Sequence, residues 1–206
     1  MFTWVPIYKE LAQRIITYRK EQQKLIEILK SLKEQGIPVI SLEDENEKGV
    51  KSPLTEIDPF TFFATFNRTI TEVNRKKSLV YIKDQLGLES PFPEDFNGIP
   101  TAQAQNSWFF AYAYERKQDD VDILWSLAEQ AVTGATLDGK LFDKCLKIKQ
   151  VGLAKLTDGL FWLAPNRFLP VDSKSHGYLI SQAIPVKVSD FESYQNLLTE
   201  VKEKLG

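Results

Sequence analysis

The segment 146–176 constrains the fold of this chain most, because it carries a whole helix together with the signals that start and stop it. A tight turn over 149–152 precedes leucines that recur at helical spacing over 153–163. Pro165 ends that helix, an extended stretch follows, and Asp172 stands where the next helix begins. The pattern predicts two helices joined by a turn that aims backbone N–H groups outward, which is a natural site for a phosphate.

Four residues of this segment are candidates for contact with phosphate groups, such as those of a nucleic-acid backbone. Gln150 and Gly152 lie in the turn, where backbone N–H groups can face a phosphate. Lys149 and Lys155 flank the turn, and their ammonium groups can neutralise phosphate charge. A plain connection between two helices is the alternative for this turn, because such connections are common.

Most of the remaining chain also predicts helices. Periodicity and capping signals favour helices over 7–35, 59–68, 71–86, 119–132, 137–148, 173–183 and 190–205, with a short strand over 37–41. Residues 42–56 and 88–106 are typical of loops, and 107–112 of an extended segment. We therefore predict a mainly α, compact multi-helix domain with a helix-hairpin-helix-like turn and one or two short strands. Residues 1–206 form one domain, either single or two-lobed with a boundary near 133–140.

Composition and missing motifs exclude several classes of function. There is no apolar run of the ~18 residues that a membrane span needs and no signal-peptide pattern, so we expect a cytoplasmic protein with no membrane partner. Cys145 and His176 are the single cysteine and histidine, so we expect no metal site and no cofactor. No Gly-x-x-x-x-Gly-Lys-Ser/Thr motif occurs, which excludes a P-loop. A net charge of −2 argues against general coating of nucleic acid but allows a local basic patch.

Aromatic and polar side chains from two segments are candidates for a pocket that stacks a base. The candidates are Phe62, Asn67, Arg68, Trp108, Phe109 and Tyr112. Aromatic rings stack on bases of any sequence, and neighbouring polar groups can read the edge of a base. Burial in the core is the alternative role for most of these rings.

The turn and the end of the segment resemble the helix-hairpin-helix of the DNA glycosylase superfamily. Ile148-Lys149-Gln150-Val151-Gly152 matches the hairpin and Pro170-Val171-Asp172 the last motif, with Gly152 and Asp172 20 residues apart. The resemblance implies that Asp172 stabilises positive charge on a sugar or activates a water. Gln150 replaces the first hairpin glycine, and Ala154 stands where lyase-type members carry a lysine, which argues against lyase chemistry. A helix N-cap explains Asp172 as well.

Three further segments resemble the N-terminal region of McrB-type restriction proteins. They are Phe2-Thr3-Trp4-Val5-Pro6-Ile7-Tyr8, residues 57–68 around Asp58-Pro59-Phe60, and residues 98–125 with Gly98-Ile99-Pro100 and Ser107-Trp108-Phe109-Phe110. In those proteins a sequence-reading domain precedes a GTP-hydrolysing AAA+ motor. The resemblance implies a DNA-binding specificity domain of a restriction or defence system that senses a modified base. It also implies double-stranded DNA, a C-terminal AAA+ motor and a nuclease subunit as partners.

Three functions are therefore open at the level of the sequence. The first is the DNA-binding specificity domain, the second a monofunctional DNA glycosylase-like enzyme that uses Asp172, and the third a non-catalytic protein-interaction module. A non-enzymatic role is the first expectation, because the chain has no P-loop, no metal cluster and no lysine at position 154.

Overall fold

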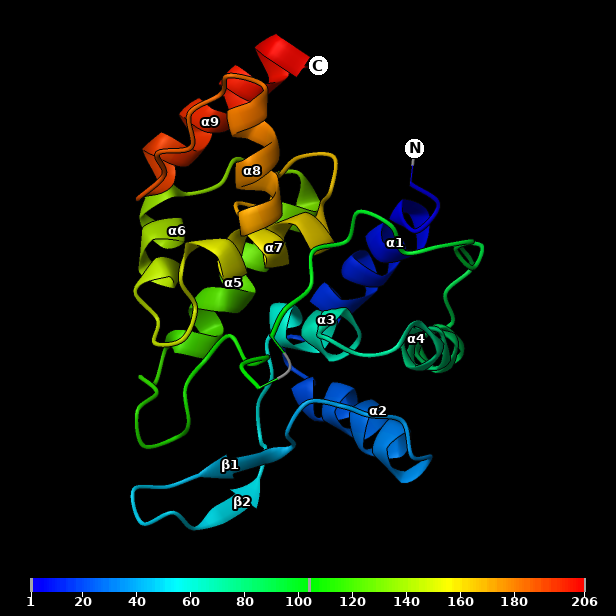
Figure 1. Ribbon diagram of the computed structural model, residues 1–206. Helices are drawn as coiled ribbons and strands as arrows, with labels where there is room; N and C mark the ends of the chain where they lie inside the picture. The colour runs from blue at the N-terminus through cyan, green and yellow to red at the C-terminus, as the bar shows by residue number, and fades with distance from the viewer. Residues whose placement is uncertain (1, 104, 206) are drawn as a thin grey trace.

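Helices make up most of the structure, as the periodicity predicts. The computed structural model describes residues 2–103 and 105–205 (Figure 1). In chain order the elements are α1 (Val5–Ile15), the 3-10 turn η1 (Ile16–Tyr18), α2 (Gln22–Glu34), β1 (Glu43–Glu45), β2 (Lys51–Pro53), α3 (Pro59–Asn67), α4 (Glu72–Leu86), α5 (Asp120–Thr133), α6 (Gly139–Leu146), α7 (Leu153–Leu163), α8 (Ser173–Ser181) and α9 (Phe191–Leu205). The predicted mainly α domain with a helix-hairpin-helix-like turn and short strands is confirmed.

Side-chain caps start several helices at the positions that the sequence indicates. Asp58 accepts hydrogen bonds from the backbone N–H groups of Phe60 (2.8 Å) and Thr61 (3.1 Å), and Pro59 occupies the first helical position. Thr71 caps α4 in the same way, and Gly87 ends α4 in the left-handed conformation (φ 60°). These local signals explain why the bounds of α3 and α4 follow the sequence so closely.

The main core forms where α3 packs against α4, α5 and α7. Every residue of α3 is buried, so its phenylalanines point into the core on more than one side, and Phe60 stacks on Phe109 at 5.3 Å between ring centroids. The core cluster continues across residues 133–140 into α6 and α7. A second, smaller cluster joins α8 and α9 through Leu179, Ile184 and Leu197.

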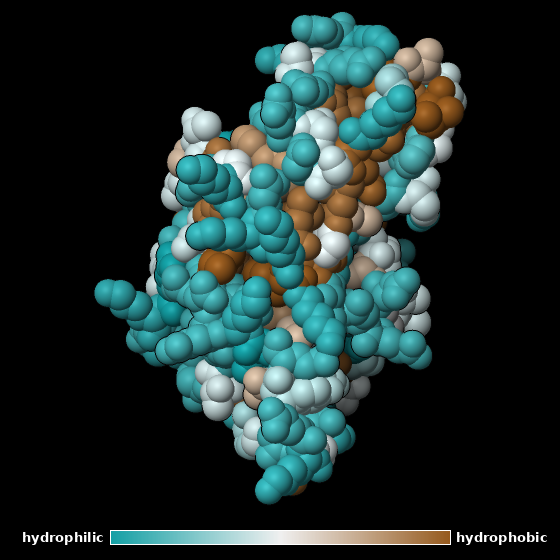
Figure 2. Space-filling view, turned by 90° about the vertical axis from the view of Figure 1, so that its left-hand side faces the viewer, coloured by the Kyte–Doolittle hydropathy of each residue, from teal (hydrophilic) through white to brown (hydrophobic). Residues whose placement is uncertain are grey.

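The two ends of the molecule differ in surface character. In Figure 1, α8 and α9 lie at the top, and the β1–β2 hairpin lies at the bottom. In Figure 2, which shows the left-hand face, apolar side chains gather in the upper half, at the height of α8 and α9, and the lower half is mostly hydrophilic. No helix within residues 2–103 and 105–205 is long and apolar enough to cross a bilayer.

The predicted continuous helix over 7–35 is wrong, because the chain bends between α1 and α2. Arg19 explains the bend. Its guanidinium leaves the helix direction to pair with Asp122 and with Glu129 (2.6 Å) on α5. Gln22, the polar residue that interrupts the apolar pattern, accepts a hydrogen bond from the backbone N–H of Ile57 (2.8 Å). Contacts with distant segments thus outweigh the local helical preference.

The predicted strand over 37–41 is also wrong, and the strands lie within the predicted loop 42–56. β1 and β2 pair in antiparallel fashion, with Asp44 opposite Ser52. The side chain of Asn46 accepts hydrogen bonds from two backbone N–H groups of the turn, and Gly49 has φ 73°, so the turn chemistry closes the hairpin. Asp44 is buried and forms an ion pair with Arg116 (2.8 Å).

Candidate functional site

The turn between α6 and α7 has the backbone geometry of a helical hairpin. Gln150 has φ 75° and Gly152 has φ 66°, both in the left-handed region, and Val151 between them is buried. The backbone N–H of Val151 donates to the carbonyl of Ile148 (3.1 Å), which closes the turn. A glutamine at positive φ costs about 1 kcal/mol, so the surrounding packing must hold Gln150 in this conformation.

A cleft of about 430 Å³ opens beside this turn. Helix α7 and its N-cap contribute Gly152, Lys155 and Asp158, and the N-cap of α8 contributes Asp172. Residues 101–103 and Asn106 form the remaining wall. Two helix N-termini therefore open onto one cavity, and each brings partial positive charge to it.

Asp158 is the most unusual group in this cleft. Its side chain lies on α7 and the residue is only 7% exposed. Its Oδ1 atom has no hydrogen-bond partner among the described residues. Burial, with a further contribution from the negative charge of Asp172, raises the pKa of Asp158 to about 8. The Asp158 carboxyl is therefore mostly protonated at neutral pH and can donate a hydrogen bond to a ligand.

Asp172 is the N-cap of α8, and it accepts a hydrogen bond from the backbone N–H of Ser175 (2.7 Å). Two contacts fix the extended segment that leads to it. The backbone N–H of Val171 donates to Thr157 Oγ1 (2.9 Å), and the Tyr194 hydroxyl donates to the carbonyl of Leu169 (2.8 Å). Helices α7 and α9 therefore set the position of Asp172 at the edge of the cleft.

Lys155 is half-buried in the cleft, and its ammonium contacts protein groups on the cleft floor. Its ammonium donates to Asn106 Oδ1 (2.8 Å), to the carbonyl of Gln150 (3.1 Å) and to the carbonyl of Trp108. Burial lowers the pKa of Lys155 to about 8. All three donors of the ammonium are thus used, and they join α7 to Asn106, to Trp108 and to the turn at Gln150. This is a different role from the phosphate contact that the sequence predicts for Lys155.

Lys149, Gln150 and Gly152 remain on the outside of the turn. The side chain of Lys149 is 59% exposed and pairs with Glu115, an ion pair that solvent screens. Gln150 and Gly152 are both exposed, and both line the cleft. These three predicted backbone-contact residues therefore surround one accessible surface.

The six predicted base-pocket residues do not lie together on the surface. Phe62, Asn67 and Phe109 are fully buried, and Trp108 is 7% exposed. Asn67 accepts a hydrogen bond from the Tyr8 hydroxyl (2.7 Å) inside the core. These buried side chains hold α3 and the segment 107–112 together, so in this conformation they cannot stack on a base.

Arg68 and Tyr112, the other two candidates, are half-buried. Arg68 donates to the carbonyl of Val39 (2.8 Å), and the Tyr112 ring packs edge-on against Trp108 at 5.4 Å between centroids. Both side chains therefore have structural partners.

Sequence reasoning missed Asp158 and Asn106 as residues of the cleft. The helical pattern places Asp158 opposite the leucines, which normally means solvent. α7 is instead buried on most sides, because Gly159 lets it approach Phe60 and Phe109 closely. The sequence contained one indication that Asp158 is buried, because this carboxylate stands inside a helix that is apolar almost throughout.

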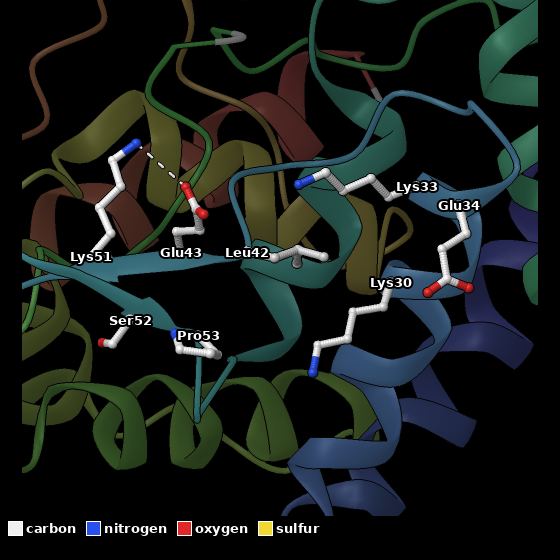
Figure 3. A pocket seen from close by; sticks show the side chains of 8 residues that line it. All are labelled: Lys30, Lys33, Glu34, Leu42, Glu43, Lys51, Ser52 and Pro53. Atoms are coloured by element: carbon white, nitrogen blue, oxygen red, sulfur yellow. Dashed lines mark hydrogen bonds and ion pairs between the residues drawn. The ribbon is translucent and has the colours of Figure 1, made fainter.

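A second hollow, of about 280 Å³, lies between α2 and the β1–β2 hairpin (Figure 3). Lys30, Lys33 and Lys51 surround it, and Lys51 pairs with Glu43 at 3.3 Å. Figure 3 shows long lysine side chains that arise from α2 and from β2. These are surface side chains, and unlike the cleft the hollow is not lined by a buried carboxyl group, so we regard the cleft as the stronger site.

Comparison with known protein families identifies the family of this chain. Residues 4–206 match the family described as Domain of unknown function (DUF8425). The chain belongs to this family. No curated protein and no solved structure matches it. The hairpin, the cleft, and Asp158 and Asp172 that line it are therefore features of a DUF8425 domain. Within the described residues, no group of three or more His, Cys, Asp or Glu side chains could hold a metal ion.

Proposed function

We propose that the chain is a cytoplasmic DNA-recognition domain that holds a DNA backbone with the turn 149–152 and receives a base in the adjoining cleft. The observation that carries the proposal is the cleft itself, which joins a left-handed turn, two helix N-termini and a buried carboxyl group. Phosphate contacts at the turn would position the domain, and groups in the cleft would specify the base.

The start of α7 is free to bind a phosphate. In the described part of the chain, no side chain caps α7, whereas Asp172 caps α8. A Cβ atom at Gly152 would meet no described atom within 4 Å, so a ligand can approach the backbone there. The first N–H groups of a helix without a cap keep their donor capacity, and the helix dipole favours an anion beside them.

Exposed lysines near the cleft supply the local positive charge that the overall composition lacks. Lys147 precedes the turn, Lys149 is its first residue, and Lys174 lies in the first turn of α8. Lys174 also lines a groove of about 550 Å³ that shares Asp172 with the cleft. A net charge of −2 then predicts weak binding whose affinity falls only modestly as salt is raised, because few phosphates are neutralised.

The resemblance to McrB-type proteins supports a biological role for this DNA recognition. The chain would be the specificity domain of a restriction or defence system and would act with an AAA+ motor and a nuclease. The segments that carry the resemblance surround α7. Trp162 Nε1 donates to the carbonyl of Pro100 (3.0 Å), and Phe60 and Phe109 lie against Gly159. Those segments thus support the element that forms the cleft.

Fluorescence anisotropy of labelled duplexes, with and without modified cytosine, tests the proposal. Lys149→Glu should weaken binding by about 3- to 10-fold at low salt, because it reverses a charge at the turn. Lys48→Glu is the matched control, since Lys48 is exposed in the β1–β2 turn, away from α7. Equal effects of the two variants, or no binding of any duplex by the wild type, would refute the proposal.

The Asp158–Asp172 pair also favours a second candidate, a DNA glycosylase-like enzyme. A protonated Asp158 could donate its proton to a departing base as the bond from C1′ to the base nitrogen breaks. An ionised Asp172 could stabilise the sugar cation and direct a water to C1′. Mass spectrometry of free bases after incubation with modified duplexes tests this candidate. Asp172→Asn should abolish any base release while DNA binding persists.

A further inference from the structure

A carboxylate from a distant segment already contacts the exposed lysine of the turn 149–152. The ammonium of Lys149 forms an ion pair with Glu115, which is 34 residues away in the chain. The Lys149 side chain is 59% exposed and that of Glu115 is 27% exposed, so the pair lies at the surface that a phosphate would approach. A phosphate at Lys149 must displace the Glu115 carboxylate or lie beside its negative charge. Both alternatives reduce the affinity of the turn for a phosphate.

The contacts of Arg116, the next residue, hold the segment that carries Glu115. The Arg116 guanidinium pairs with Asp44 on β1 (2.8 Å), and both side chains are almost fully buried. The backbone N–H groups of Glu115 and Arg116 both donate to the carbonyl of Tyr112 (2.8 and 2.9 Å), so the backbone forms a tight turn at this point. These contacts do not involve Lys149. Glu115 should therefore keep its place when Lys149 is replaced.

We infer that Glu115 is an internal competitor of the DNA phosphate at the turn 149–152. This inference rests on the proposed function, because it names a regulatory contact at the surface that the DNA backbone would occupy. The backbone contact carries no sequence information, so Glu115 weakens the binding of every duplex by the same factor. The turn alone then holds DNA weakly, and stable binding requires the additional contacts of the cleft.

The variant Glu115→Gln tests the inference, because it keeps the size of the side chain and removes its charge. Fluorescence anisotropy at low salt should show that this variant binds a labelled duplex about three- to fivefold more tightly than the wild type, the size expected when an exposed ion pair no longer competes. Glu47→Gln is the matched control. It changes the net charge equally, and Glu47 is exposed in the β1–β2 turn. An unchanged affinity in Glu115→Gln, or equal gains in the two variants, would overturn the inference and leave the proposed DNA binding intact.

A double-mutant cycle with Lys149→Met separates competition for Lys149 from general repulsion of DNA by the Glu115 charge. Without Lys149, the Glu115 carboxylate has no ammonium to release. Glu115→Gln should therefore improve binding by less than about twofold in the Lys149→Met background. Equal gains in the two backgrounds would show that Glu115 repels DNA without competing for Lys149, which would contradict the inference.

Duplexes with and without modified cytosine test whether the contact acts on the DNA backbone. Both duplexes present the same phosphates, so the gain in Glu115→Gln should be the same for the two. A gain confined to one duplex would contradict an effect on the backbone contact. If neither the wild type nor Glu115→Gln binds any duplex, the inference and the proposed function are both wrong.

Discussion

Thr157 Oγ1 accepts a hydrogen bond from the backbone N–H of Val171 at 2.9 Å, and this contact joins the two walls of the cleft. Thr157 is fully buried on α7, next to Asp158, and Val171 directly precedes Asp172. The hydroxyl proton points back to the carbonyl of Leu153 (3.0 Å), which leaves the oxygen lone pair for Val171. Thr157 therefore helps to set the position of Asp172 relative to α7, together with the contact between Tyr194 and Leu169.

Replacement of Thr157 by valine should loosen the approach to Asp172. The variant keeps the shape of the side chain but leaves the N–H of Val171 without its acceptor, which costs about 1–3 kcal/mol. Hydrogen exchange measured by NMR should show faster exchange of the Val171 amide. Thr157→Ser retains the hydroxyl and is the control. Equal exchange rates in the valine and serine variants would show that this hydrogen bond does not hold the segment.

Asp158 should destabilise the fold as the pH rises from about 4 to about 8. Its pKa is 3.8 in the unfolded chain and about 8 in the folded protein, so the unfolded state loses its proton first over this range. The stability that the protonated form provides is complete below pH 4 and is lost by pH 8. Asp158→Asn removes the titration and should stabilise the protein at pH 7, by on the order of 2–4 kcal/mol.

Urea unfolding at pH 4, 7 and 9 measures this effect. The gain from Asp158→Asn should be near zero at pH 4 and reach its full value at pH 8 and above. Burial also raises the pKa of Asp58, to about 6, so its ionisation lowers the stability of the fold as the pH rises to that value. This effect is the same in the wild type and in Asp158→Asn, and it therefore cancels in the difference between their free energies of unfolding. A gain that does not change with pH would contradict the raised pKa of Asp158.

Gly159 should not tolerate a methyl group. A Cβ atom there would lie 2.7 Å from Phe60 Cδ1 and 3.0 Å from Phe109 Cε1, closer than carbon atoms can pack. Gly159→Ala should therefore lower the free energy of unfolding by about 1–3 kcal/mol, although alanine favours helices. Gly177→Ala on α8 is the matched control, because a Cβ at Gly177 meets no described atom within 4 Å. Thermal melts of both variants make the comparison, and an unaltered melt of Gly159→Ala would show that α7 can shift.

Lys155→Met should destabilise the protein more than Lys149→Met. The first variant removes the donor to Asn106 Oδ1 and to two backbone carbonyls, and the loss of these contacts costs about 2–4 kcal/mol. The second removes one exposed ion pair with Glu115, which contributes about 0–1 kcal/mol. Chemical unfolding at pH 6.5 measures both. Similar losses in the two variants would contradict the internal role of Lys155.

The sequence predicts the helices best where the signals are local. Asp58 with Pro59 starts α3, and Gly134 (φ 81°) ends α5, because capping and left-handed conformations depend on a few neighbouring residues. The bend after α1 was not predictable in this way, since it depends on the pairing of Arg19 with α5. Distant partners of this kind leave no periodic pattern in the chain.

The sequence predicts the backbone elements that form the candidate site, but it does not predict which buried side chains line the cleft. The turn 149–152 and the cap Asp172 follow from spacing and residue type. The burial of Asp158 does not, because it depends on how closely α7 approaches α3 through Gly159. Aromatic residues such as Phe62 and Phe109 are common both in cores and in base pockets, and only the three-dimensional packing shows that these two are fully buried.

An NMR titration of the ¹⁵N-labelled chain with a short duplex that carries one unpaired cytosine tests DNA binding by the cleft most directly. The largest chemical-shift changes should fall on the amides of 150–155 and 172–175, which surround the cleft, and should become smaller as salt is raised. The chemical shifts of the amides of 43–53 in the β1–β2 hairpin should not change. Changes confined to 43–53, or no changes at low salt, would contradict the claim that the cleft beside the α6–α7 turn binds DNA.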